Sequence, residues 1–141
     1  MPALAAIRRS LSKRKKALRR VNLVLEKNTI LVVDDDEDCR EALVFLLSSE
    51  GYRVISASDG REALECLHRS PAALIILDLM MPVMDGWEFR RRQKDDPQLK
   101  SVPVVVLTAA WNPYTIDAQA IIRKPIDVEA LIAAVKQNCA P

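Results

Sequence analysis

The sequence is poor in the residue types on which many catalytic and metal sites depend. Its single histidine, His68, excludes triads and metal clusters built on histidine. The three cysteines, Cys39, Cys66 and Cys139, are odd in number and lack CxxC spacing. They therefore predict neither a disulfide framework nor a zinc site, and they fit a reducing cytoplasm. No apolar run approaches the roughly 18 residues that a membrane-spanning helix needs.

Charge is distributed unevenly along the 141 residues, half of which are hydrophobic. Residues 1–27 hold nine Lys or Arg and one acid, Glu26, whereas the remainder holds 12 basic and 18 acidic residues. A chain of this length and composition is expected to form one domain with a core of its own. We therefore predict a basic N-terminal extension over residues 1–27, an acidic domain over 28–138 and a C-terminal stub over 139–141.

The N-terminal extension carries leucine at every seventh position, at residues 4, 11, 18 and 25. A helix formed here would be basic and amphipathic, a type that binds an anionic membrane or nucleic acid or pairs with another helix. The same residues also fit a disordered extension, upstream sequence included by a wrongly assigned start codon or, superficially, an Arg-rich transit peptide. The sequence leaves these alternatives open.

From Thr29 onward, strand-like and helix-like segments alternate. The predicted strands cover residues 30–33, 53–56, 74–77, 102–107 and 120–123. Three of them are continuous apolar runs, which is typical of central parallel strands covered on both faces. Apolar residues at helical spacing lie between them, with Asp59 and Asp127 at positions that suit helix caps. This alternation predicts an α/β fold, a doubly wound five-stranded parallel sheet in the flavodoxin-like order 2-1-3-4-5.

Two of the apolar runs end in carboxylates. Asp34, Asp35 and Asp36 follow the run at 29–33, and Asp78 follows the run at 73–77. In the order 2-1-3-4-5 these two strands are neighbours, and their carboxyl ends meet at the switch point of the sheet. Carboxylate, carbonyl and water oxygens are the ligands that Mg²⁺ prefers. The sequence therefore predicts a Mg²⁺ (or Mn²⁺) site at this edge.

Four segments, each at the end of a predicted strand, carry a resemblance to a known family. They are ILVVDD at 30–35, LDLMMPVMDG at 77–86, VLTA at 106–109 and KP at 124–125. In this order they resemble the receiver domain of bacterial two-component response regulators, over roughly residues 28–138. The resemblance implies a stand-alone, single-domain regulator of the cytoplasm. Such a protein takes a phosphoryl group from a sensor histidine kinase or a histidine phosphotransfer protein and then binds an output protein.

The resemblance also implies a role for each matching acid. Asp78 matches the phosphoacceptor, whose carboxylate attacks a phosphohistidine and forms an acyl phosphate. Asp35 matches a direct Mg²⁺ ligand, and Asp34 matches an acid that acts through a metal-bound water. Met80 matches the residue whose backbone carbonyl supplies a further metal ligand. A divalent ion is expected because close carboxylates repel one another and the incoming phosphoryl group.

The remaining matches surround the phosphoryl group in the family. Thr108 matches a hydroxyl that bonds a phosphoryl oxygen, and Lys124 matches an ammonium that pairs with another. The backbone N–H of Ala109 is expected to complete this cradle. Pro125 implies a cis peptide bond after the lysine.

Two departures from the family pattern are visible. Ile121 stands three residues before the lysine, where the family usually carries Tyr or Phe as a rotamer switch. The stretch from Thr108 to Lys124 is also shorter than the family pattern, and Asn112-Pro113 interrupts its start. We therefore expect the fourth helix of the receiver, which lies between the fourth and fifth strands, to be shortened or missing.

Two other functions fit parts of the sequence. The first is an interaction domain that keeps the receiver fold but signals without phosphorylation. The second is a metal-dependent phosphohydrolase, whose chemistry usually requires an acid two residues after the nucleophile, where this chain has Met80. Beyond its own phosphorylation and dephosphorylation, the chain is therefore not expected to be an enzyme.

Overall fold

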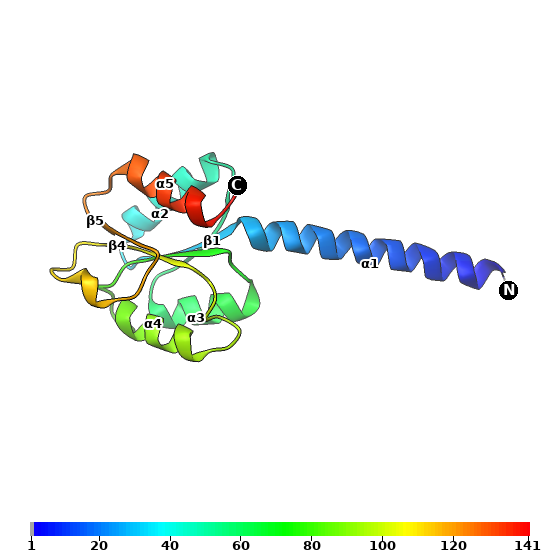
Figure 1. The fold of residues 1–141 in the computed structure, drawn as a ribbon, viewed down its shortest axis with the longest axis horizontal. Helices are drawn as coiled ribbons and strands as arrows, with labels where there is room; N and C mark the ends of the chain where they lie inside the picture. Colours follow the sequence, from blue (N-terminus) through cyan, green and yellow to red (C-terminus); the bar gives the residue numbers. More distant parts are fainter. Residues whose placement is uncertain (1) are drawn as a thin grey trace.

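A single parallel sheet with helices on both faces forms the body of the protein, and one long helix leaves it at the N-terminus (Figure 1). The structure, a computed structural model, describes residues 2–141 apart from the side chains of residues 22–26. The elements in chain order are α1 (Pro2–Asn28), β1 (Thr29–Val33), α2 (Glu37–Ser49), β2 (Arg53–Ala57), α3 (Gly60–Arg69), β3 (Leu74–Leu77), α4 (Gly86–Asp95), β4 (Val104–Thr108), the 3-10 turn η1 (Pro113–Thr115), β5 (Ala120–Arg123) and α5 (Val128–Asn138).

The five strands are parallel and lie in the order β2-β1-β3-β4-β5, which confirms the predicted topology. Strands β1, β3 and β4 are fully buried, as their continuous apolar sequences predicted. Strand β4 begins at Val104, later than expected, because Pro103 has no N–H with which to join the ladder. All five carboxyl ends consequently lie along one edge of the sheet.

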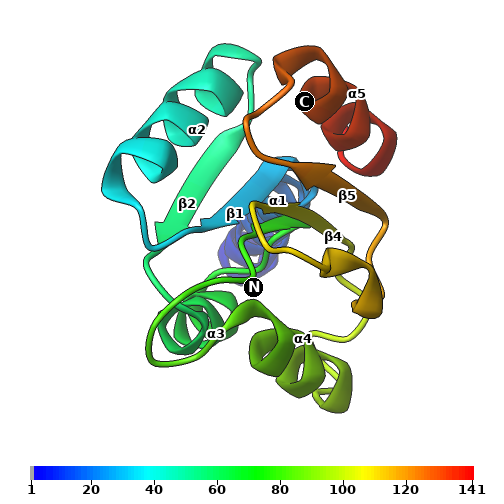
Figure 2. The same ribbon diagram turned by 90° about the vertical axis from the view of Figure 1, so that its left-hand side faces the viewer.

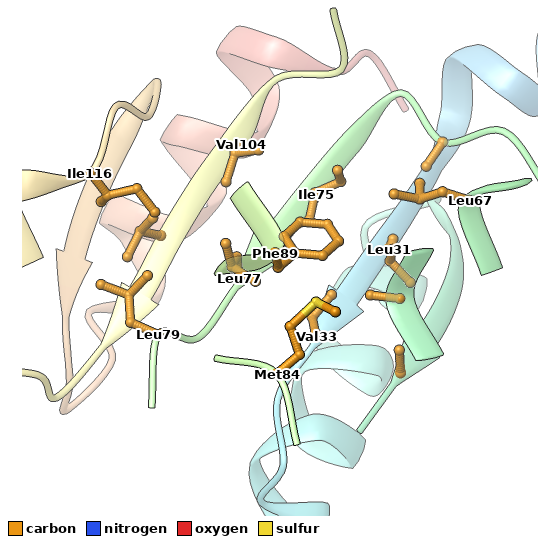
Figure 3. Close-up of a cluster of buried hydrophobic side chains, with 14 of the residues drawn as sticks. Leu31, Val33, Leu67, Ile75, Leu77, Leu79, Met84, Phe89, Val104 and Ile116 are labelled. Atoms are coloured by element: carbon orange, nitrogen blue, oxygen red, sulfur yellow. The ribbon is translucent and has the colours of Figure 1, made fainter. Parts of the chain in front are cut away.

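Helices α2 and α5 cover one face of the sheet, and α3 and α4 cover the other (Figure 2). Each face has its own apolar cluster. One joins alternate strand residues such as Ile30 and Ile76 to Leu43, Leu47 and Leu131 of the covering helices. The other, drawn in Figure 3, places the Phe89 ring of α4 among residues of β1, β3 and β4; its labelled members include Leu31, Val33, Ile75, Leu77 and Val104.

Aspartates begin all four helices that cover the sheet. The side chains of Asp36, Asp59, Asp85 and Asp127 each accept a hydrogen bond from a backbone N–H in the first turn of the following helix. This contact satisfies an amide that has no partner within the helix, and the negative charge interacts favourably with the helix dipole. The cap roles predicted for Asp59 and Asp127 are confirmed.

The segment between β4 and β5, where a receiver usually has its fourth helix, contains the 3-10 turn η1 and no α-helix. The prediction that this helix is shortened or missing is therefore confirmed. Several contacts hold this segment to the body. Ile116 is buried in the core, and the Trp87 indole N–H donates to Thr115 Oγ1 over 3.1 Å. Asp117 forms an ion pair of 2.8 Å with Lys94 of α4. The short connection is therefore packed on α4.

Both ends of the domain are joined at the base of α1. The Asn28 side-chain amide donates to the Gly51 carbonyl over 3.2 Å, and the Cys139 thiol donates to the Lys27 carbonyl over 3.2 Å. Cys139 is buried, and its own carbonyl accepts a hydrogen bond from the Tyr52 hydroxyl. None of the helices within residues 2–141 is both long enough and apolar enough to cross a membrane.

Gly86 sits where helix α4 begins against the loop that follows β3. A Cβ at this position would lie 2.6 Å from the Asp78 carbonyl oxygen and 2.7 Å from Leu79 Cα. Both distances are shorter than real Cβ contacts, and both neighbours are backbone atoms. The start of α4 is thus pressed directly on the segment that carries Asp78.

We expect Gly86→Ala to lower the free energy of unfolding by roughly 1–3 kcal/mol, because the added methyl must displace backbone. Urea unfolding followed by circular dichroism measures the change. Glu65→Ala on α3 is the control; Glu65 forms an exposed ion pair with Arg61, so the effect should stay within about 0.5 kcal/mol. Equal stability of Gly86→Ala and wild type would show that this close approach is not needed.

Candidate functional site

The candidate site lies at the carboxyl edge of the sheet, where β1 and β3 end side by side. Val33 pairs with Leu77 in the ladder, which sets Asp34 beside Asp78. The Asp78 N–H donates to the Val33 carbonyl over 2.9 Å and extends this pairing by one residue. The convergence predicted from the sequence therefore follows from the register of the two strands.

Three carboxylates meet at this edge. Oxygen atoms of Asp34, Asp35 and Asp78 all lie within 4.8 Å of one another. Asp34 and Asp78 are 2% and 6% exposed, whereas Asp35 is exposed. All of the donors are hard oxygens, at a spacing that a small ion with several ligands at about 2.1 Å can bridge with modest adjustment. This donor set fits Mg²⁺ or Mn²⁺.

Lys124 is the cation that contacts these carboxylates directly among the described residues. Its ammonium lies 2.9 Å from Asp34 Oδ2 and 3.4 Å from Asp78 Oδ2. Burial of Lys124 opposes its charge, but the hydrogen bond to Asp34 and the attraction of Asp78 outweigh burial and raise its pKa above the ordinary lysine value. One positive charge faces three acids, so the cluster keeps an excess of negative charge that a divalent ion would balance.

Thr108 closes the opposite side of Asp78. Its hydroxyl donates to Asp78 Oδ1 over 2.9 Å and accepts from the Ala110 N–H over 3.2 Å. The same Oδ1 accepts from the Met80 N–H at 3.3 Å. Ala109, between Thr108 and Ala110, is exposed at the mouth of the site. Both oxygens of Asp78 are thus held, one by Thr108 and Met80 and the other by Lys124.

The structure brings together five of the residues singled out from the sequence, namely Asp34, Asp35, Asp78, Thr108 and Lys124. It adds two contacts that sequence reasoning missed. The Arg40 guanidinium donates to the Asp34 carbonyl over 2.8 Å, and the Ala110 amide holds the Thr108 hydroxyl. Neither contact has a signal in the sequence, because each depends on how a neighbouring segment turns over the strand ends. The Lys124-Pro125 bond is cis, as the resemblance implied.

Cys39 lies near the site on α2 and packs against the core, as expected of a structural cysteine. Burial first, and then the hydrogen bond and charge of Asp34, raise the pKa of its thiol to about 11. The thiol therefore stays protonated at neutral pH, and it is less reactive than a free cysteine.

The aromatic and apolar residues beside the site divide into two groups. Trp111 and Tyr114 are exposed at 95% and 68%, on the segment between β4 and β5. Ile121, where the family usually has an aromatic switch, is half-buried on β5 and packs against the cluster of Figure 3. A side-chain switch of the usual kind is therefore absent from β5, and the exposed aromatics lie on the preceding loop.

The comparisons with known proteins agree with this geometry. The family model of the response regulator receiver domain matches residues 30–136, and the chain belongs to this family. It is a receiver domain of two-component signalling. Receiver domains of this family interact in general with histidine kinases and with output partners.

Two curated relatives illustrate the extent of the similarity. A 14.6 kDa protein from the sodA1 3′ region of Leptolyngbya boryana is 39% identical over 123 residues, which cover 82% of this chain and 92% of that protein. Response regulator RR06 of Streptococcus pneumoniae is 38% identical over 113 residues, covering 76% of this chain but 51% of that protein. The chain thus spans about half the length of some relatives that it matches.

Solved structures show the same fold. The chemotaxis protein CheY4 of Vibrio cholerae superposes with a TM-score of 0.71 at 32% identity, covering 78% of this chain and 97% of that one. The N-terminal domain of a response regulator receiver protein from Methanoculleus marisnigri superposes with a TM-score of 0.64 at 39% identity, covering 80% and 97%. The match to the family model begins at residue 30, so α1 lies outside it.

Removal of two different lysines is expected to lower the free energy of unfolding by different amounts. Lys124→Met leaves the buried Asp34 and Asp78 without a cation and should lower the free energy of unfolding by about 2–3 kcal/mol. Lys136→Met, whose ion pair with Glu50 is 3.8 Å long and exposed, should change it by less than about 0.5 kcal/mol. Denaturant unfolding at pH 7 without divalent ions measures both.

The raised pKa of Lys124 determines how its contribution to stability changes with pH. Its stabilisation is complete below the ordinary lysine pKa and is lost only in strongly alkaline solution, as pH rises through the folded-state value. Neutral pH therefore reports the full difference. Equal costs for the two variants would contradict the role assigned to Lys124.

Proposed function

We propose that this receiver domain accepts a phosphoryl group on Asp78, with Mg²⁺ bound beside it, and signals through protein–protein contacts. The observation that carries the proposal is the environment of the Asp78 carboxylate. One oxygen is held by Thr108, the other by Lys124, and Asp34 and Asp35 lie within metal-ligand distance. A structural carboxylate would need only its hydrogen bonds; the two additional acids beside it are costly unless a cation joins them.

The proposed reaction starts with the Asp78 carboxylate and a phosphohistidine of a sensor kinase or a phosphotransfer protein. A lone pair of a carboxylate oxygen forms the new P–O bond as the P–N bond breaks, and the bonding electrons return to the imidazole nitrogen. Because Thr108 and Lys124 already contact Asp78, their hydroxyl and ammonium are placed to bind oxygens of the transferred group. The exposed Ala109 N–H is proposed to donate to a third.

Metal binding is assigned to Asp34, Asp35, Asp78 and the backbone carbonyl of Met80. When bound, Mg²⁺ would supply positive charge against the carboxylates and the phosphoryl oxygens, which is its usual role in phosphoryl transfer. Asp34 also keeps its own place without a metal, because its Oδ1 accepts the Asp36 N–H at 2.9 Å and its Oδ2 binds Lys124. This arrangement suits an acid that contacts the ion through water.

The two other functions receive less support. An interaction domain that signals without phosphorylation would have no need for Asp35, Thr108 and Lys124 around Asp78. A phosphohydrolase would need an acid where Met80 stands, and the Met80 side chain is 61% exposed, with no group that transfers a proton. We therefore propose that the domain acts in the cytoplasm as a phosphoacceptor and not as an enzyme with an external substrate.

Phosphorylation tests the assignment of Asp78 directly. Acetyl phosphate or phosphoramidate with Mg²⁺ should add a single hydroxylamine-labile phosphoryl group, detected by intact-protein mass spectrometry. Asp78→Asn should abolish it, because an amide is not a nucleophile. Asp85→Asn is the matched control in the same loop; asparagine caps α4 as well as aspartate does, so labelling should persist. Labelling of Asp78→Asn at the wild-type rate would refute the assignment.

A measurement of Mg²⁺ binding distinguishes the roles of two adjacent acids, Asp35 and Asp36. Asp35→Asn removes a proposed ligand and should weaken Mg²⁺ binding by about tenfold or more, which shrinks the rise in melting temperature on adding Mg²⁺. Asp36→Asn removes the same charge one residue later, where the side chain caps α2, and should bind Mg²⁺ nearly as the wild type does. Equal losses in both variants would indicate diffuse electrostatic attraction and no defined ligand at Asp35.

A further inference from the structure

Helix α1 is the largest part of the chain that the phosphoacceptor function leaves unexplained. It runs from Pro2 to Asn28 and extends away from the domain (Figure 1). At 1.5 Å per residue its length is about 40 Å. Every residue from Pro2 to Val21 is exposed, so no part of the domain covers this stretch. Packing within the chain therefore does not account for its apolar residues.

The exposed apolar side chains of α1 lie on one side of the helix. At 3.6 residues per turn they fall within an arc of about 100°. They are Leu4, Ile7, Leu11, Leu18 and Val21, each more than half exposed. We call this set the apolar stripe. In water it leaves five large side chains unburied, which is unusual for a helix that has no partner.

The remainder of the α1 surface is basic. Arg8, Lys15 and Arg19 border the apolar stripe along one edge, and further cations cover the opposite side, namely Arg9, Lys13, Lys16 and Arg20. Residues 2–21 contain no acid. Arg14 falls within the apolar stripe, where a long side chain can bury its methylenes and extend its guanidinium to a polar surface. Any partner must therefore accept both apolar side chains and a dense positive charge.

We propose that α1 is a membrane-surface anchor, with the apolar stripe inserted among the acyl chains and the basic side facing anionic lipid headgroups. An anionic lipid surface is the partner that uses both sides of the helix at once. Duplex nucleic acid would match the positive charge but leave the apolar stripe in water.

A second copy of α1 fits poorly. Pairing would bury the stripe, but it would bring eight Lys and Arg of residues 2–21 against eight more with no acid between them. The acidic domain of another copy is also a weak match, because many of its acids are engaged. Four aspartates of the domain act as helix caps, and Glu88 and Asp117 form ion pairs with basic residues of α4.

The topology separates the phosphoacceptor site from α1. Helix α1 leads directly into Thr29, the first residue of β1, whereas Asp34 and Asp35 follow the last residue of that strand. The anchor and the site therefore lie at opposite edges of the sheet. A kinase or an output protein could therefore approach Asp78 without contacting α1.

Co-sedimentation of the full chain with vesicles tests the proposal. Binding should be about tenfold or more stronger to vesicles of phosphatidylcholine mixed with phosphatidylglycerol than to phosphatidylcholine alone, and it should weaken in high salt. Two double variants with the same net charge distinguish insertion of the apolar stripe from electrostatic attraction to the lipid. Leu11→Glu with Leu18→Glu changes the apolar stripe, and Ala5→Glu with Ser12→Glu changes the polar side at the same spacing. The first pair should bind about tenfold more weakly than the second.

Each alternative gives a distinct result. Failure to bind the mixed vesicles, or an equal loss in both double variants, would overturn the proposal. Binding to duplex DNA in its place, reduced equally by both pairs, would assign α1 to nucleic acid. Dimerisation in sedimentation velocity that only the stripe variants abolish, without vesicle binding, would assign it to a second copy. All four positions are exposed, so phosphorylation of Asp78 should be unchanged and confirms that each variant is folded.

Discussion

Repulsion among three carboxylates at one sheet edge is the constraint on which the rest of the domain depends. Asp34 and Asp78 are nearly buried, and one lysine faces them directly. Left alone, such a group of charges would push the ends of β1 and β3 apart. The domain withstands this repulsion because the two strands lie in the middle of the sheet, with a fully apolar layer on each face.

The same constraint explains the positions of the surrounding residues. Lys124 follows the end of β5 and contacts Asp34 at the end of β1, with β4 and β3 lying between these two strands in the sheet, so the last strand is linked to the first. Thr108 holds Asp78 from β4, and Gly86 lets α4 approach the backbone of Asp78 without a side chain in between. The end of β1 thus contributes two groups to the cluster, Asp34 and Asp35, and the ends of β3, β4 and β5 contribute one each. A change in the charge of Asp78 would therefore alter the interactions at the ends of all four strands.

Sequence reasoning predicted the sheet order and the convergence of the three acids because both depend on local patterns. Apolar runs that end in acids identify central strands and the edge where they stop. It placed the start of β4 too early, since Val102 and Pro103 look apolar but the proline has no N–H to donate to the ladder. It missed the Arg40 and Ala110 contacts, which arise from long-range folding and leave no pattern. For residues 1–27 it left helix and disorder open, whereas the structure forms the helix α1 from Pro2 to Asn28.

Locating a divalent ion at the strand ends is the most direct test of the proposed metal site. A crystal of the wild-type protein soaked in Mn²⁺, measured at a wavelength where manganese scatters anomalously, shows the ion without assumptions about ligands. We expect one strong peak coordinated by oxygens of Asp35, Asp78 and the Met80 carbonyl, with Asp34 beside it. A peak elsewhere, or no peak while Lys124 keeps both of its carboxylate contacts, would contradict the claim that these acids converge to hold a metal.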